Sequence, residues 1–175
     1  MCDPKIGHIK KVCGTTYIKG IKMKAFLTTL PEVTAIPDPT TDTLEIDTNV
    51  TFRSAVTGPP AVAAGQWWEW DISTVKGTWK VEPQGDEDNP TFKVTVDVFI
   101  HGITPERSYT VNQTLGHQFL AVVGDNHGNN RLVGEMGRGC TVKMGEEIVD
   151  SNGYKGTIEW ETGHLPYFYN GTLPT

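Results

Sequence analysis

The fold class is decided by residues 103–135, ITPERSYTVNQTLGHQFLAVVGDNHGNNRLVGE. Their pattern predicts a short capped helix followed by a β-hairpin. Thr104 can serve as the N-cap, and Pro105 can take the first helical position, where a missing N–H costs nothing. Gly116 can adopt the left-handed conformation that ends many helices. These signals predict a helix from Pro105 to about Thr114.

An apolar, β-rich segment follows the predicted helix. The pattern from His117 to Val123 does not by itself separate a buried strand from a buried helix, but its length and its β-branched pair Val122 and Val123 favour a strand. Six turn-forming residues at 125–130 then precede an extended pattern at 131–135. This order predicts a hairpin with a polar tip.

Alternating apolar and polar residues predict further strands on both sides of this stretch. They are expected at 20–27, 44–52, 67–81, 92–101, 141–144 and 154–162, and residues 84–90 read as an acidic hairpin tip. In the first of them, Lys22, Lys24 and Phe26 are expected on a solvent-facing side. About eight or nine strands and one short α-helix predict a mainly β fold, either a β-sandwich or a partly closed barrel.

The chain of 175 residues fits a single domain with a basic N-terminal arm and two long loops. The arm is expected at 1–20, and the loops at about 28–43 and 53–66. Loops of more than about 12 residues without secondary structure usually have a functional reason, and contact with a neighbouring subunit is one. The candidate residues for such an inter-subunit loop are Pro59, Pro60, Gly65 and Trp67.

Charge and hydropathy limit the function classes. A net charge of -6 argues against a conventional nucleic-acid binder, because phosphate contacts need clustered Lys and Arg. No apolar run follows the N-terminal lysines, and no segment approaches the roughly 18 apolar residues of a spanning helix. We therefore expect synthesis in a cytosol-like compartment without membrane anchoring.

Residue types that carry chemistry are present but do not form a recognisable site. Cys2, Cys13 and Cys140 are expected to be free thiols, and Cys2 with His8 lacks the tight spacing of a zinc site. A nominal Cys/His/Asp set lacks any signature that would place a thiol beside a base; its members are His117, Asp125, His127 and Cys140. The oxygen-rich turn at 125–130 lacks the closing Glu of a calcium loop. We expect no enzymatic activity, metal or cofactor.

Three neighbouring tryptophans leave a carbohydrate-binding alternative open. Alternation places Trp68 and Trp70 on the same face as Ile72, where a core position is favoured, whereas Trp67 on the opposite face is the better surface candidate.

The order of motifs resembles structural proteins of phages and prophages of Bacteroides-type bacteria. The motifs are TPER, a helix, an apolar strand, DNHGNN, RLVGE, SNGYKGT and LPYFY, and the resemblance covers about residues 92–170. The chain resembles a phage major tail tube protein in particular. This resemblance implies a virion protein made in the host cytoplasm, with subunits that form stacked hexameric rings around a channel. Its partners would be further copies of itself, a tape measure protein and other tail proteins, with double-stranded DNA as transient cargo.

A DNA conduit should not bind its cargo tightly, and an acidic or neutral polar lumen fits the net charge. The candidate lumen-facing residues are Glu45, Asp47, Asn49 and Thr51, which form the most acidic polar strand face available. Two alternatives stay open, namely another virion component such as a head decoration or adaptor protein, and a monomeric β-sandwich that binds a glycan or a protein.

Overall fold

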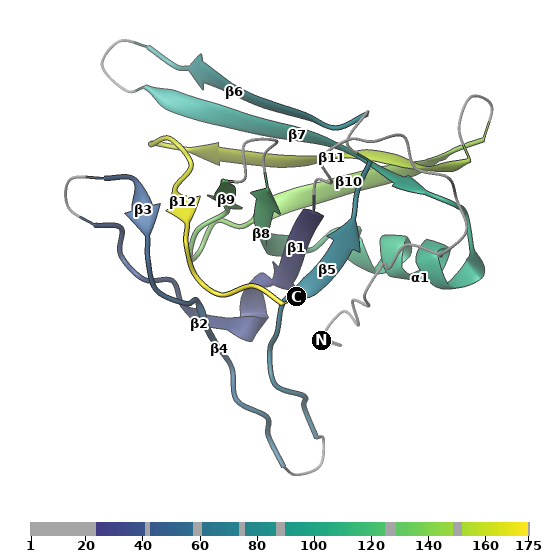
Figure 1. Cartoon of the computed structure of the whole chain (residues 1–175), viewed down its shortest axis with the longest axis horizontal. Helices are drawn as coiled ribbons and strands as arrows, with labels where there is room; N and C mark the ends of the chain where they lie inside the picture. Colours follow the sequence, from purple (N-terminus) through teal and green to yellow (C-terminus); the bar gives the residue numbers. More distant parts are fainter. Residues whose placement is uncertain are drawn as a thin grey trace.

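A computed structural model of the chain describes residues 24–40, 43–57, 61–73, 76–86, 90–124, 129–148 and 152–174. These residues form a mainly β fold with a single α-helix, and most of the strands belong to one strongly curled sheet that resembles half a barrel (Figure 1). The predicted mainly β fold with one short helix is confirmed. The predicted basic arm at 1–20 lies outside the described residues.

The elements, in chain order, are β1 (Lys24–Thr29), the 3-10 turn η1 (Leu30–Glu32), β2 (Val33–Ala35), β3 (Glu45–Ile46), β4 (Thr51–Phe52), β5 (Trp68–Asp71), β6 (Thr78–Gln84), β7 (Thr91–His101), α1 (Pro105–Thr114), β8 (Gln118–Gly124), β9 (Asn130–Val133), β10 (Cys140–Glu147), β11 (Gly153–Thr162) and β12 (Phe168–Tyr169). The main sheet has the order β3-β12-β9-β8-β10-β11-β7-β6, and β1 joins it by pairing with both β8 and β5. β2 and β4 form a separate two-stranded sheet.

Strand β8 is the centre of the molecule. Its residues pair with β1 on one side, and with β9 and β10 on the other. The residues of β8 are almost all buried because apolar layers cover both of its faces. A strand buried on both sides reads as a continuous apolar run, and this explains the FLAVV sequence at 119–123.

Two hydrophobic cores lie on the two sides of β1 and β8. The first core fills the inside of the curl and includes Leu27, Trp70, Val96, Phe119, Tyr154 and Trp160. The second core includes Phe26, Ile46, Trp67, Leu120, Leu132 and Tyr169. Alternate residues of β1 therefore enter different cores, and the expectation that Phe26 faces solvent is wrong.

Helix α1 begins and ends where the sequence predicts. The Thr104 hydroxyl accepts a hydrogen bond from the N–H of Arg107 at 3.3 Å, and Pro105 opens the first turn. Gly116 follows the helix with a φ of 78°. The hydroxyls of Ser108 and Tyr154 lie 2.6 Å apart and join α1 to β11.

Three segments differ from their predicted structures. The expected strand at 44–52 is divided into β3 and β4, which belong to different sheets, because β3 pairs with β12 whereas β4 pairs with β2. The expected strand at 67–81 is divided into β5 and β6. The expected loop at 28–43 contains the end of β1, η1 and β2. The described residues therefore hold twelve strands, several of them short, rather than eight or nine.

The predicted long loop at 53–66 is an extended arm with two paired legs. Val56 and Val62 form an antiparallel bridge, and the N–H of Gly65 donates to the carbonyl of Arg53 at 2.9 Å. Figure 1 shows the two legs projecting away from the sheets between β4 and β5. Pro59 and Pro60 lie outside the described residues.

Candidate functional site

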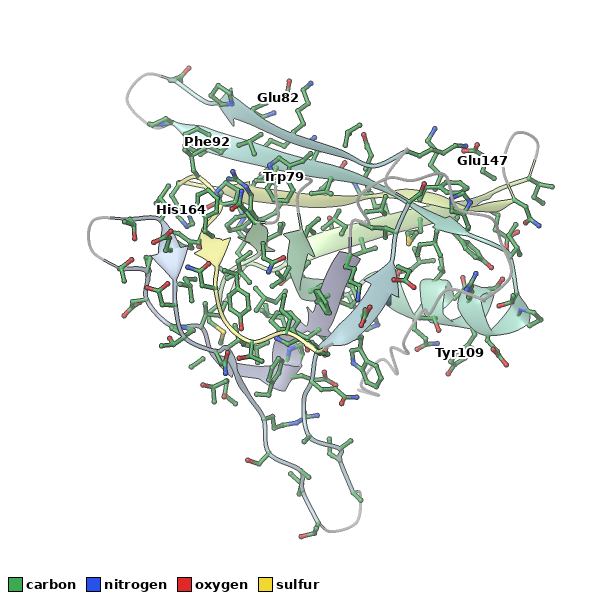
Figure 2. The ribbon with its side chains drawn as sticks, in the orientation of Figure 1. Trp79, Glu82, Phe92, Tyr109, Glu147 and His164 are labelled. Carbon is green, nitrogen blue, oxygen red and sulfur yellow. The ribbon has the colours of Figure 1, made fainter. Side chains whose placement is uncertain are left out.

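Four neighbouring strands present a mainly polar surface on the outside of the curl, with one exception at Phe99 of β7, which is buried beneath the ammonium of Lys76. In β6, Trp79 and Val81 pack against the first core, whereas Lys80 and Glu82 are exposed. Figure 2 shows Trp79 and Glu82 on opposite sides of this strand. The same alternation continues through β7, β11 and β10, which pair in antiparallel register.

This surface, which we call the polar sheet face, carries charges of both signs. Its charged members are Lys80, Lys93, Lys143, Lys155, Glu82, Asp97, Glu147, Glu159 and Glu161. Four lysines of these strands face five carboxylates, and Lys76 and Arg138 from outside the strands pair with Glu147 and Glu161, so the surface is close to neutral.

Short ion pairs run across the polar sheet face. The ammonium of Lys143 lies 2.7 Å from the carboxylate of Glu159 on the neighbouring strand, and that of Lys80 lies 2.6 Å from Glu82. The hydrogen bond from Lys143 lowers the pKa of Glu159 below its ordinary value, with smaller attraction from Lys93. The carboxylate of Glu159 therefore stays ionised over a wider pH range and keeps the ion pair intact.

Strand β6 is an open edge of the main sheet. Within the described part of the chain it pairs with β7 alone, so the backbone groups along its other side have no partner strand. Pro83 lies on this strand, as is typical of edge strands, because proline cannot donate to a ladder. An unpaired edge of this length is a template for pairing with another chain.

The predicted lumen-facing residues do not share one strand. Glu45 lies on β3 and Thr51 on β4, in different sheets. Between them, the Asp47 carboxylate accepts a hydrogen bond from the amide of Asn170 at 2.8 Å, and the Asn49 side-chain oxygen accepts one from the N–H of Thr172 at 2.6 Å. The continuous acidic strand face expected here is therefore absent, and these residues hold the C-terminal segment instead. Their exposure to a lumen stays a prediction.

Two predicted inter-subunit residues lie in close contact with their own subunit. A Cβ atom at Gly65 would come within 2.7 Å of the carbonyl oxygen of Glu32, so the arm passes tightly against η1 at this point. Trp67 is only 5% exposed and packs edge to face against Phe52 and Tyr169. The expectation that Trp67 is a surface residue is wrong, whereas Trp70 is buried in the first core and the half-buried Trp68 packs against that core, as predicted.

The described part of the nominal Cys/His/Asp set is not arranged for catalysis. Cys140 is fully buried, its thiol donates to the carbonyl of Phe119, and burial raises the pKa of the thiol to about 12. Such a thiol is protonated at neutral pH and is a poor nucleophile. His117 lines a separate open groove of about 470 Å³ between η1 and the turn that follows β9, where no carboxylate or other charged side chain accompanies it. Asp125 and His127 lie outside the described residues.

The described part of the chain contains no group of three or more His, Cys, Asp or Glu side chains placed to hold a metal ion. None of its helices is long and apolar enough to cross a membrane.

The polar sheet face as a unit is not among the sites predicted from the sequence. Its signal lies in Thr78–Gln84, where Trp79 and Val81 alternate with Lys80 and Glu82, but the strand expected at 67–81 combines part of this stretch with the preceding tryptophans. No protein-family model, curated protein or solved structure matches the chain.

Proposed function

We propose that this protein is the self-assembling subunit of a phage tail tube, in which hexameric rings of the chain stack around a channel for DNA. The observation that carries this proposal is the four-stranded sheet β6-β7-β11-β10, which combines an open edge with a mainly polar face of mixed charge. The number of subunits and the phage setting rest on the resemblance of residues 92–170 to tail tube proteins.

The open edge supplies the means of ring formation. A ring in which each subunit adds an edge strand to its neighbour leaves no exposed edge when it closes, and this removes the aggregation risk that β6 carries alone. Pairing between sheets would also make the polar sheet face continuous from one subunit to the next.

The charge of the polar sheet face suits the wall of a DNA channel. Most of its lysines already lie against carboxylates of the same subunit, as in the pairs Lys80–Glu82 and Lys143–Glu159. A phosphate backbone meets few free cations on such a surface, so DNA can pass without the contacts that would hold it.

The arm at 53–66 provides a second type of contact. It projects beyond the sheets (Figure 1), and its paired legs give it the stiffness to reach another subunit or ring. Tape measure and other tail proteins would be further partners, and the assembled protein would be located in the virion.

The direct test is the assembly state of the purified chain. We expect rings or hollow tubes by negative-stain electron microscopy, and a concentration-dependent species by sedimentation velocity. A chain that remains monomeric at high concentration would contradict the proposal. Rings that never stack would instead favour an adaptor or head decoration protein.

Amide hydrogen exchange tests the role of the edge itself. Alternate N–H groups of a strand point to opposite sides, so in β6 one set faces β7 and the other faces outward. In the monomer only the first set should be protected from exchange, and assembly should protect the second set. The amides of α1 serve as the control, since their protection should be equal in both states.

A further inference from the structure

Arg131 lies at the open side of the curl, between strands that are far apart in the sheet order. It pairs with Phe168 of β12, which in turn pairs with Glu45 of β3, so the three side chains form a row on one face. Trp79 reaches the same place from the opposite margin of the sheet. Figure 2 shows Trp79 on the side of β6 that faces the body of the molecule.

The guanidinium of Arg131 is held by aromatic rings. Its central carbon lies 4.3 Å from the ring centre of Phe168 and 5.8 Å from that of Trp79. The guanidinium carries a planar fork of N–H donors, and neither ring offers this fork a hydrogen-bond acceptor. This fork matches the two oxygens of a carboxylate.

Arg131 has no carboxylate partner among the described residues. Six other cationic side chains do form ion pairs within the subunit, namely Lys24, Lys76, Lys80, Lys143, Lys155 and Arg138. The nearest carboxylate in the row is that of Glu45, but it lies two strands away, a separation of roughly 10 Å at the usual strand spacing. The two rings therefore contact the Arg131 guanidinium, while its N–H donors have no acceptor among the described residues.

We infer that Arg131 is an anchor for a carboxylate of a second copy of this chain, an inference that rests on the proposed function. Trp79 belongs to the open edge strand and contacts the guanidinium, so a strand that pairs with β6 arrives close to Arg131. A second copy is rich in suitable groups, because residues 24–175 carry 20 Asp and Glu side chains against 10 Lys and Arg. Arg131 thus adds a specific ionic contact to the backbone pairing of the edge.

A purely internal role for Arg131 makes a different prediction. If Arg131 only connects Trp79 to Phe168 within one subunit, it stabilises the monomer and has no effect on association. The two roles separate when anion binding and assembly are measured independently of folding.

The first measurement is a titration of the dilute monomer with sodium acetate, followed through the Nε–H signal of Arg131 by NMR. We expect a saturable shift that sodium chloride at the same ionic strength does not produce. Arg138, whose guanidinium lies 2.9 Å from Glu161, is the internal reference and should shift less. If acetate and chloride shift the Arg131 signal equally, the inference that Arg131 binds a carboxylate is contradicted.

The second measurement compares the assembly of Arg131→Lys and Arg131→Gln with that of Arg138→Gln. Lysine keeps the charge and the ring contact but loses the planar fork, so both Arg131 variants should require about a tenfold higher concentration to assemble. Arg138→Gln should assemble like the wild type. If both Arg131 variants assemble at the same concentration as the wild type, Arg131 is not an anchor, but the proposed function is unaffected. If the wild-type chain itself stays monomeric, both the anchor and the proposed function are contradicted.

Discussion

The Tyr169 hydroxyl accepts a hydrogen bond from the backbone N–H of Val50 at 3.3 Å, although the two residues are 119 positions apart in the chain. Val50 lies between β3 and β4, and Tyr169 ends β12, so this bond joins the start of the fold to its C-terminal strand. Both residues are buried in the second core. The bond satisfies a backbone donor that water does not reach.

Tyr169→Phe should lower the free energy of unfolding by about 1 to 3 kcal/mol, because it leaves the buried N–H of Val50 without an acceptor. Urea denaturation followed by tryptophan fluorescence measures the change. Tyr167→Phe is the matched control, since Tyr167 is only partly buried and its hydroxyl has no such bond. An equal loss in both variants would show that the hydrogen bond is not the cause.

Thr104→Ala should lower the free energy of unfolding by about 0.5 to 2 kcal/mol, because the hydroxyl caps α1 through the N–H of Arg107. Thr104→Ser keeps the accepting oxygen and should retain most of the wild-type stability. Thermal melts followed by circular dichroism compare the three proteins. If alanine and serine melt at the same temperature, the cap contributes nothing to stability.

Caps, prolines, glycines and turn residues correctly predicted those elements whose limits depend only on residues close by in the chain. The cap at Thr104, the proline after it and Gly116 fix the limits of α1, and each acts within one turn of the helix. On either side of the predicted acidic tip, β6 and β7 pair in register, with Gln84 opposite Thr91. Such features depend on neighbours in the chain and are therefore visible in the sequence.

Positions that depend on a distant layer were not predictable in the same way. Alternation correctly separated Trp67 from Trp68 and Trp70, but it could not show that a second core covers the other face. The same cause explains the error at Phe26. The division of 44–52 depends on β12, more than 110 residues later, which pairs with β3 and not with β4.

The candidate site was only partly predictable for a related reason. The polar residues of β7 were evident from their alternation with Val94, Val96 and Val98. Their union into one surface requires the order β6-β7-β11-β10, which brings together strands from the middle and the end of the chain. No local pattern encodes that order.

Lys143→Met should produce a stability loss that depends on pH. The pKa of Glu159 is lowered by its hydrogen bond with Lys143, so the bond stabilises the folded state above the ordinary pKa of 4.5 and this contribution is lost as the pH falls through the lowered value. The loss at pH 7 should be below about 1 kcal/mol because the pair is solvent-exposed. Urea denaturation at pH 7 and at pH 3 measures it, and a loss of equal size at both would contradict the assignment.

Cysteine accessibility should decide which surface lines the channel. Thr157 lies on β11 in the polar sheet face, whereas Asp47 lies beside the C-terminal segment among the residues first expected to face the lumen. Thr157→Cys and Asp47→Cys would each be made with Cys2→Ser and Cys13→Ser, and the buried Cys140 should not react. Each protein is treated with a small maleimide and with a maleimide carried on a large polyethylene glycol, as separated subunits and as tubes.

In separated subunits both cysteines should react with both reagents. In tubes, a cysteine at 157 should still react with the small maleimide, which can diffuse through the channel, but it should be protected from the large one, which cannot enter. A cysteine at 47 should react with both, because the structure places Asp47 on an exposed segment away from the polar sheet face. The reverse pattern would assign the lumen to the surface around Asp47. Protection of residue 157 from both reagents would instead place the polar sheet face in a contact between subunits.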